Sequence, residues 1–169
     1  EKNIRFSPKT LDIFETAKSS PLRDTCHFKN EEKSLHQTEC HYFGDEATIA
    51  VLGNSHAVEL AYALAEVLKP YNDSIKHHSM SDCTHNYQVI GEEESVCYRW
   101  HQTVLDKLIS DANIKTVVLS YRNEEQLKKE KYRKSLVEIT ETLLSAKKKV
   151  ILVLQAPLLD AHIGKYLNA

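Results

Sequence analysis

Residues that break or bend a polypeptide are scarce in this sequence: its 169 residues include only 4 glycines and 4 prolines. Their scarcity excludes collagen-like and proline-rich linker proteins. Long apolar runs are missing as well. The longest, residues 150–154, has the length of a strand, whereas a membrane helix needs roughly 18 apolar residues. The chain does not open with a basic segment followed by an apolar one, so we expect no signal peptide in it.

Neither sign of charge is in excess, because 22 lysines and arginines face 24 aspartates and glutamates and give a net charge of −2. This balance argues against a nucleic-acid partner held through phosphate contacts. The hydrophobic fraction of 41% is too high for a disordered chain. A chain of this length is expected to form one domain with a core of its own.

The four cysteines form two pairs with equal spacing, because Cys26 and Cys40 are 14 residues apart, as are Cys83 and Cys97. Each pair brackets a polar, turn-rich stretch. Pairing within each stretch would close two short loops, and each closure would be worth about 3 kcal/mol in the chain-entropy account of disulfides. We therefore expect two disulfides, Cys26–Cys40 and Cys83–Cys97, and an oxidising compartment.

Reduced thiols and a metal site are the alternatives to disulfides. His27 directly follows Cys26 and His41 directly follows Cys40, so four ligands that zinc accepts lie in two adjacent pairs. Adjacent Cys-His pairs lack the usual chelate spacing, however, and the other two cysteines would be left over. No metal is expected.

The hydrophobic pattern divides the chain into two parts. Residues 1–45 are polar without a sustained period, which predicts an irregular N-terminal arm or linker, tied by a disulfide, with a short helix around residues 11–17. Residues 46–169 alternate buried strands with amphipathic helices, which predicts an α/β domain: a three-layer αβα sandwich with a mainly parallel sheet. The expected strands are residues 47–52, 74–79, 116–121 and 150–154, and the expected helices are residues 57–68, 100–112 and 124–148.

Ligand sites in parallel sheets lie at the carboxyl ends of strands, where the first predicted strand runs into Gly53, Asn54 and Ser55. A serine at such a strand-to-helix turn lies beside the free N–H groups of the helix N-terminus, which can stabilise an oxyanion. This pattern indicates a nucleophile. The local pattern alone favours a serine that merely caps the helix over a nucleophile, and both interpretations stay open.

The segment LGNSHA at residues 52–57 resembles the G-D-S-H block of SGNH hydrolases. More closely, it resembles the SGNH domain fused to the C-terminus of membrane acyltransferase-3 proteins, which O-acetylate bacterial surface polysaccharides. Three further features match that family: the cysteine-bounded loop at residues 83–97, the strand end LSYR at residues 119–122, and a strand that leads to Pro157. Together they span residues 47–157 and imply an SGNH/flavodoxin-like fold.

The resemblance implies a role for each matching position. Ser55 would be the nucleophile that forms an acyl-enzyme, with its own N–H in the oxyanion hole. Arg122 would bind an acyl oxygen or a substrate carboxylate, or else form a salt bridge at the sheet edge. Asn54 and Asn123 would assist in oxyanion or substrate binding. Asp82 lies in the loop where the family's second block supplies a further N–H.

The same resemblance implies a function and a location. It implies an O-acyltransferase, with hydrolase activity possible, on the periplasmic side of the bacterial inner membrane. The acetyl donor, derived from acetyl-CoA, would come through a membrane acyltransferase domain of the same polypeptide, and a surface glycan such as an O-antigen would be the acceptor. No cofactor is expected in this domain. The alternatives are a non-catalytic glycan-binding domain and a secreted carbohydrate esterase.

The sequence departs from the family at three places. Asn54 replaces the usual Asp; it lacks the negative charge but can still hydrogen-bond across the turn. Asn123 stands where Trp is common. The D-x-x-H block that supplies the base is not evident, because Asp160 and His162 have the wrong spacing. The block is expected beyond Ala169 or in a disordered segment; otherwise the domain is inactive.

Several remaining histidines are expected to play structural or solvent-exposed roles. His77 and His78 alternate across a predicted strand, so they cannot both face one site. His85 and His101 are expected to be solvated, and Trp100 is expected in the core.

Overall fold

The computed structural model describes residues 7–9, 11, 19–44, 46–122 and 128–154. In this part of the chain, a single five-stranded sheet has the strand order β1-β3-β2-β4-β5. Its last four strands in chain order are parallel, and β1 pairs antiparallel with β3. The strands are β1 (Cys40–Tyr42), β2 (Ile49–Gly53), β3 (Ile75–Ser79), β4 (Thr116–Ser120) and β5 (Lys149–Leu152).

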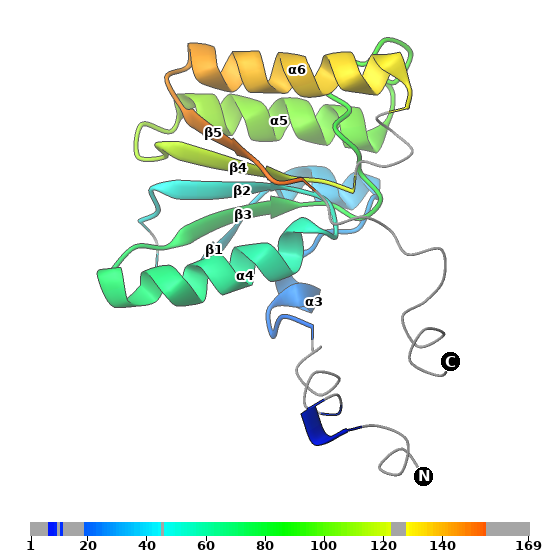
Figure 1. Ribbon diagram of the computed structural model, residues 1–169. Helices are drawn as coiled ribbons and strands as arrows, with labels where there is room; N and C mark the ends of the chain where they lie inside the picture. The colour runs from blue at the N-terminus through cyan, green and yellow to red at the C-terminus, as the bar shows by residue number, and fades with distance from the viewer. Residues whose placement is uncertain (1–6, 10, 12–18, 45, 123–127, 155–169) are drawn as a thin grey trace.

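Helices cover both faces of this sheet, as Figure 1 shows. Helix α4 (Ala57–Leu68) and the short α3 (Arg23–Cys26) pack on one face, and α5 (Val96–Ser110) and α6 (Glu130–Ser145) pack on the other. Two 3₁₀ turns, η1 (Glu32–His36) and η2 (Lys69–Tyr71), complete the described elements. The predicted three-layer α/β sandwich is therefore confirmed.

The central strands β2 and β4 owe their position to continuous apolar runs, which suit a strand that is covered on both faces. All their residues after the first are buried. Strand β5 was expected to be buried too, and that prediction is wrong. Ile151 and Leu152 are 41% and 43% exposed, because β5 lies at the edge of the described sheet with β4 as its one described neighbour.

The N-terminal part contains more regular structure than the predicted irregular arm, because it contributes α3, η1 and β1. Most of the short helix expected around residues 11–17 lies outside the described residues. The division of the chain into residues 1–45 and 46–169 stays a prediction.

Both predicted disulfides are present, and each joins cysteines whose Cα atoms are 5.4 Å apart. Cys26–Cys40 ties α3 to β1, and Cys83–Cys97 ties the segment after β3 to the first turn of α5. The four cysteines are therefore neither free thiols nor zinc ligands. Among the described residues, no group of three or more His, Cys, Asp or Glu side chains is placed to hold a metal ion.

The buried histidines correct a second expectation. His85 and His101, expected in solvent, are completely buried, as are Trp100, His77 and His78. Trp100 lies in the core as predicted.

No described helix has both the length and the apolar character that crossing a membrane requires.

Candidate active site

The candidate site lies where the strand order of the sheet reverses. From β2 the chain passes through α4 on one face to β3, and from β3 it returns through α5 on the other face to β4. The carboxyl ends of β2 and β4 therefore lie side by side while their connections diverge. Such a switch point is where parallel sheets bind ligands. Ser55 follows β2 and Arg122 follows β4.

Gly53 allows the two strand ends and the start of α4 to meet. It pairs in register with Ser120 of β4. A Cβ atom added to Gly53 would lie 1.8 Å from the carbonyl oxygen of Ser120 and 2.8 Å from the Cβ of Ala57. Glycine is required here by the close approach of the two backbones.

Asn54 connects the two loops that follow these strands. Its side chain is buried, and its Oδ1 accepts hydrogen bonds from the backbone N–H of His56 and of Arg122, both at 3.1 Å. The Ser120 hydroxyl adds a longer bond of 3.4 Å to the carbonyl of His56. Asn54 thus makes the hydrogen bond across the turn that the sequence led us to expect, and a second one to the neighbouring strand end.

Ser55 is partly exposed beside this junction. The interpretation of Ser55 as a helix cap is wrong, because the N-cap position of α4 is His56, whose own side chain accepts no hydrogen bond from the first turn of the helix. Within the described residues, neither the hydroxyl nor the backbone N–H of Ser55 has a hydrogen-bond partner. In the described part of the chain, both groups are therefore unpaired beside the N-terminus of α4.

Arg122 is exposed and forms no ion pair with another described residue. The residue before it, Tyr121, is buried, and its hydrogen bond to α5 holds the end of β4 in place. The Tyr121 hydroxyl donates to Nε2 of His101 at 2.9 Å, and Nδ1 of His101 donates to the carbonyl of Cys97 at 2.9 Å. Burial lowers the pKa of His101 to about 4, so the ring is neutral at pH 7.

Asp82 lies in the turn after β3, the strand that flanks β2 on the side opposite β4. Its backbone is left-handed, with φ 56°, a conformation that Asp tolerates better than most residues, and its side chain is exposed. Asn123, the remaining predicted site residue, lies outside the described residues, as does His162.

His27 is a residue near this edge that the sequence analysis considered only as a zinc ligand. Its Nδ1 lies 2.8 Å from the hydroxyl of Ser79 and its Nε2 lies 3.0 Å from that of Ser81. The next residue, Phe28, pairs with Met80 as if it continued the sheet. The arm therefore covers the carboxyl end of β3. In the sequence, the one signal that could have placed His27 near this edge was the disulfide predicted at Cys26, directly before it.

The surroundings of His27 lower its pKa. Burial lowers its pKa first and the charge of Arg23 lowers it further, while Asp82 and Glu59 act in the opposite direction. Glu59, in the first turn of α4, pairs with Arg23 at 2.6 Å and accepts a bond from the N–H of Ser20 at 2.5 Å. These contacts hold the arm against the start of α4.

Comparison with known proteins gives one match. The model of a family described as SGNH domain (fused to AT3 domains) matches residues 25–168. No match was found among the curated proteins or among the solved structures. The matched range begins just before Cys26 and includes both disulfides, Ser55 and Arg122.

Proposed function

Because the chain belongs to the family of SGNH domains described as fused to AT3 domains, we propose that it transfers an acetyl group to a hydroxyl of a bacterial surface glycan through an acyl-enzyme on Ser55. The family itself indicates acyl transfer or hydrolysis of an acyl ester. The observation that carries the proposal is the partly exposed Ser55, with its hydroxyl and N–H unoccupied by described residues at the switch point of the sheet.

The reaction would proceed in two steps. The Ser55 oxygen attacks the acyl carbon, the bond from that carbon to the donor breaks, and the donor leaves with a proton. A glycan hydroxyl then attacks the acyl-enzyme, and Ser55 regains a proton as the new ester departs. In both steps the N–H of Ser55 would stabilise the oxyanion. The proton acceptor is expected from a D-x-x-H block outside the described residues.

Arg122 would orient the acceptor or the acyl oxygen in this scheme. Its guanidinium is exposed, and its backbone is fixed to the Ser55 turn through Asn54. A guanidinium suits recognition of a carboxylate on an acidic sugar as well as an acyl oxygen. Asp82, on the opposite side of Ser55, would present the N–H groups of its turn.

The proposal also includes a partner and a location. The acetyl group would reach Ser55 from a membrane acyltransferase domain of the same polypeptide, on the periplasmic side of the inner membrane, with acetyl-CoA as its origin. The description of the family supports the partner. Two disulfides fit an oxidising compartment such as the periplasm.

The test replaces the nucleophile in the protein within its bacterial host. Ser55→Ala should abolish O-acetylation of the surface glycan, measured by NMR of the purified polysaccharide. Ser145→Ala, an exposed serine at the end of α6, is the matched control and should leave acetylation unchanged. Unchanged acetylation in the Ser55 variant would remove this residue from the mechanism.

A non-catalytic role in glycan binding is the second candidate. It is favoured by the fact that no described side chain bonds to Ser55 as a base would. A fluorophosphonate probe, applied to the protein with its membrane partner, separates the two functions. Labelling at Ser55 supports acyl chemistry. Hydrolysis by a carbohydrate esterase would use the same serine, and release of free acetate without glycan acetylation would reveal it.

A further inference from the structure

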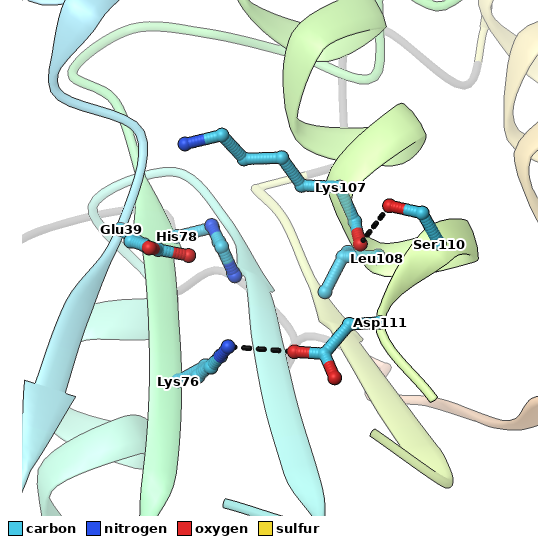
Figure 2. Close-up of a pocket in the computed structure, with 7 residues that line it drawn as sticks. All are labelled: Glu39, Lys76, His78, Lys107, Leu108, Ser110 and Asp111. Atoms are coloured by element: carbon cyan, nitrogen blue, oxygen red, sulfur yellow. Dashed lines mark hydrogen bonds and ion pairs between the residues drawn. The ribbon is translucent and has the colours of Figure 1, made fainter. Parts of the chain in front are cut away.

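A pocket lies on the α5 face of the sheet, and Ser55 is not among the residues that line it. Its volume is about 240 Å³, and it opens between β3, the segment before β1 and the last turn of α5 (Figure 2). Helix α5 runs from the Cys83–Cys97 disulfide back toward the amino ends of the strands, so its last turn lies far from the carboxyl edge. The side chains that matter for the argument are Glu39, Lys76, His78, Lys107 and Asp111.

His78 presents an unused acceptor to this pocket. The side chain is completely buried, and its Nδ1 lies 2.5 Å from the carbonyl oxygen of Thr38. A carbonyl only accepts, so Nδ1 carries the proton and donates. Burial lowers the pKa of His78 to about 4, which leaves Nε2 as a lone-pair acceptor without a partner among the described residues. In Figure 2 a ring nitrogen points into the space between Lys76 and Leu108.

The neighbouring histidine shows why the cavity matters. His77 is equally buried and its Nε2 also lacks a described partner, but it faces Tyr42 on the other side of the sheet and lines no part of this pocket. An unpaired ring nitrogen is therefore common in this strand. His78 differs because a space large enough for a ligand lies in front of it.

Two lysines supply donors around the same space. Lys76 donates to Asp111 at 2.6 Å, and Lys107 donates to the Thr38 hydroxyl at 2.6 Å. An ammonium group has three N–H donors, so each lysine keeps donors for a ligand. With Glu39 and Asp111, the lining carries two positive and two negative groups.

The combination of two ammonium groups, two carboxylates and the unpaired Nε2 of His78 favours one class of ligand over the others. A fully ionised anion cannot donate to Nε2 of His78 and would meet two carboxylates. A cation would meet two ammonium groups, and an apolar ligand would leave buried polar groups unpaired. A hydroxyl both donates and accepts. The volume lies below the range of about 300–1,000 Å³ typical of drug-sized ligands but far above the roughly 30 Å³ of one water.

We propose that this pocket binds a neutral, polyhydroxylated ligand of about the size of one sugar unit, with one hydroxyl donating to Nε2 of His78 and others accepting from Lys76 and Lys107. The site does not depend on Ser55 or on acyl chemistry. It would give the domain a second contact to a saccharide, on the α5 face of the sheet beside β3.

The test is an NMR titration of the histidine ring signals of the 169-residue chain. The probes are the methyl β-glycosides of glucose, galactose and mannose, taken to tens of millimolar, with inorganic phosphate in a parallel series. At least one glycoside should shift the His78 signals in a saturable way and leave those of His77 unchanged. Ser55→Ala should bind equally, so the failure of either proposal can be recognised independently.

Two variants test the contacts. Lys107→Met and Lys76→Met should each weaken binding about tenfold or more, the usual effect of losing a hydrogen bond to a charged group. Their thermal midpoints without ligand show whether they fold. The proposal is overturned if no glycoside moves the His78 signals, which would leave water as the occupant, if phosphate moves them and the glycosides do not, or if folded variants bind as tightly as the original chain.

Discussion

The carboxyl edge of the sheet is open at one place and covered at another. The open end lies where β2 and β4 finish, and the covered end lies where β3 finishes. At β2 and β4, the junction of Gly53, Asn54 and Ser120 leaves Ser55 and Arg122 accessible. At β3, the N-terminal arm continues the sheet past the strand end. There its Phe28 pairs with Met80, while His27 bonds the hydroxyls of Ser79 and Ser81.

The difference shows that topology and covalent ties decide together where a site can form. The open end exists because the helices that follow β2 and β4 in the chain, α4 and α6, lie on opposite faces of the sheet. The end of β3 is not at this switch point, and the Cys26–Cys40 disulfide holds the arm that covers it. Substitutions at the two ends should therefore have different consequences.

The largest effect should come from Gly53→Ala at the open end. The new Cβ would overlap the carbonyl of Ser120, so β2 and β4 must separate, at an expected cost of more than about 4 kcal/mol in unfolding free energy. Gly44→Ala is the control, because the nearest atom to its Cβ would be that of Ser74 at 3.6 Å, and it should change stability by less than about 0.5 kcal/mol. Urea denaturation measures both. Equal effects would contradict the close approach.

Acid should act on both ends together, because each rests on buried neutral histidines. Burial lowers the pKa of His101, below the open end, to about 4 and that of His77, in β3, to about 3, from the usual 6.5. The unfolded chain therefore binds protons first, and stability should be complete above pH 6.5 and fall as the pH drops toward 4.

Each group can contribute about 1.4 kcal/mol per pH unit over that window, so the total loss should reach several kcal/mol. Denaturation curves between pH 7 and 4 measure it, and NMR of the ring signals shows whether one end opens before the other. A stability that does not change over this window would contradict the burial of these rings.

Removing each disulfide in turn distinguishes the open end from the covered end more sharply. Cys26→Ala with Cys40→Ala should cost about 3 kcal/mol and release His27 from the end of β3, seen as faster amide exchange. Cys83→Ala with Cys97→Ala has the same loop length, so it should cost a similar amount without releasing His27. Equal exchange at His27 in the two variants would contradict the covering role of the first disulfide.

A smaller effect is expected for Asn54→Ala, which removes the acceptor for the N–H groups of His56 and Arg122. The expected cost is about 2 kcal/mol, typical of buried donors left unpaired. Asn54→Asp keeps an acceptor oxygen at this position and should lose much less. If thermal denaturation shows that both variants lose the same stability, these two bonds do not hold the loops together.

Much of the fold could be predicted from local sequence pattern. The runs in β2 and β4 are apolar enough to be central strands, and the spacing in α4 and α5 fixes their buried faces. The turn at Ser55 followed from the strand before it and the helix after it. The ends of β2 and β4 lie together because of the strand order, which the sequence did not reveal; the resemblance to a family implied only the type of fold.

The failures have physical causes. The apolar run of β5 does not reveal whether the strand lies at the centre or the edge of a sheet, because that depends on its neighbours. Strand β1 has three residues and forms against β3 beside a disulfide, so it has no local signal. His101 could have been predicted as buried, because it lies four residues after Cys97 and three before Val104, on the buried stripe of α5.

The most direct test of the central claim is to map the acyl group itself. The protein should be isolated with its membrane partner during glycan acetylation and digested for peptide mass spectrometry. The account predicts an acetyl group on the Ser55 hydroxyl, absent in Ser55→Ala, whose glycan also lacks acetyl groups. An unmodified Ser55 together with full glycan acetylation in the variant would contradict it.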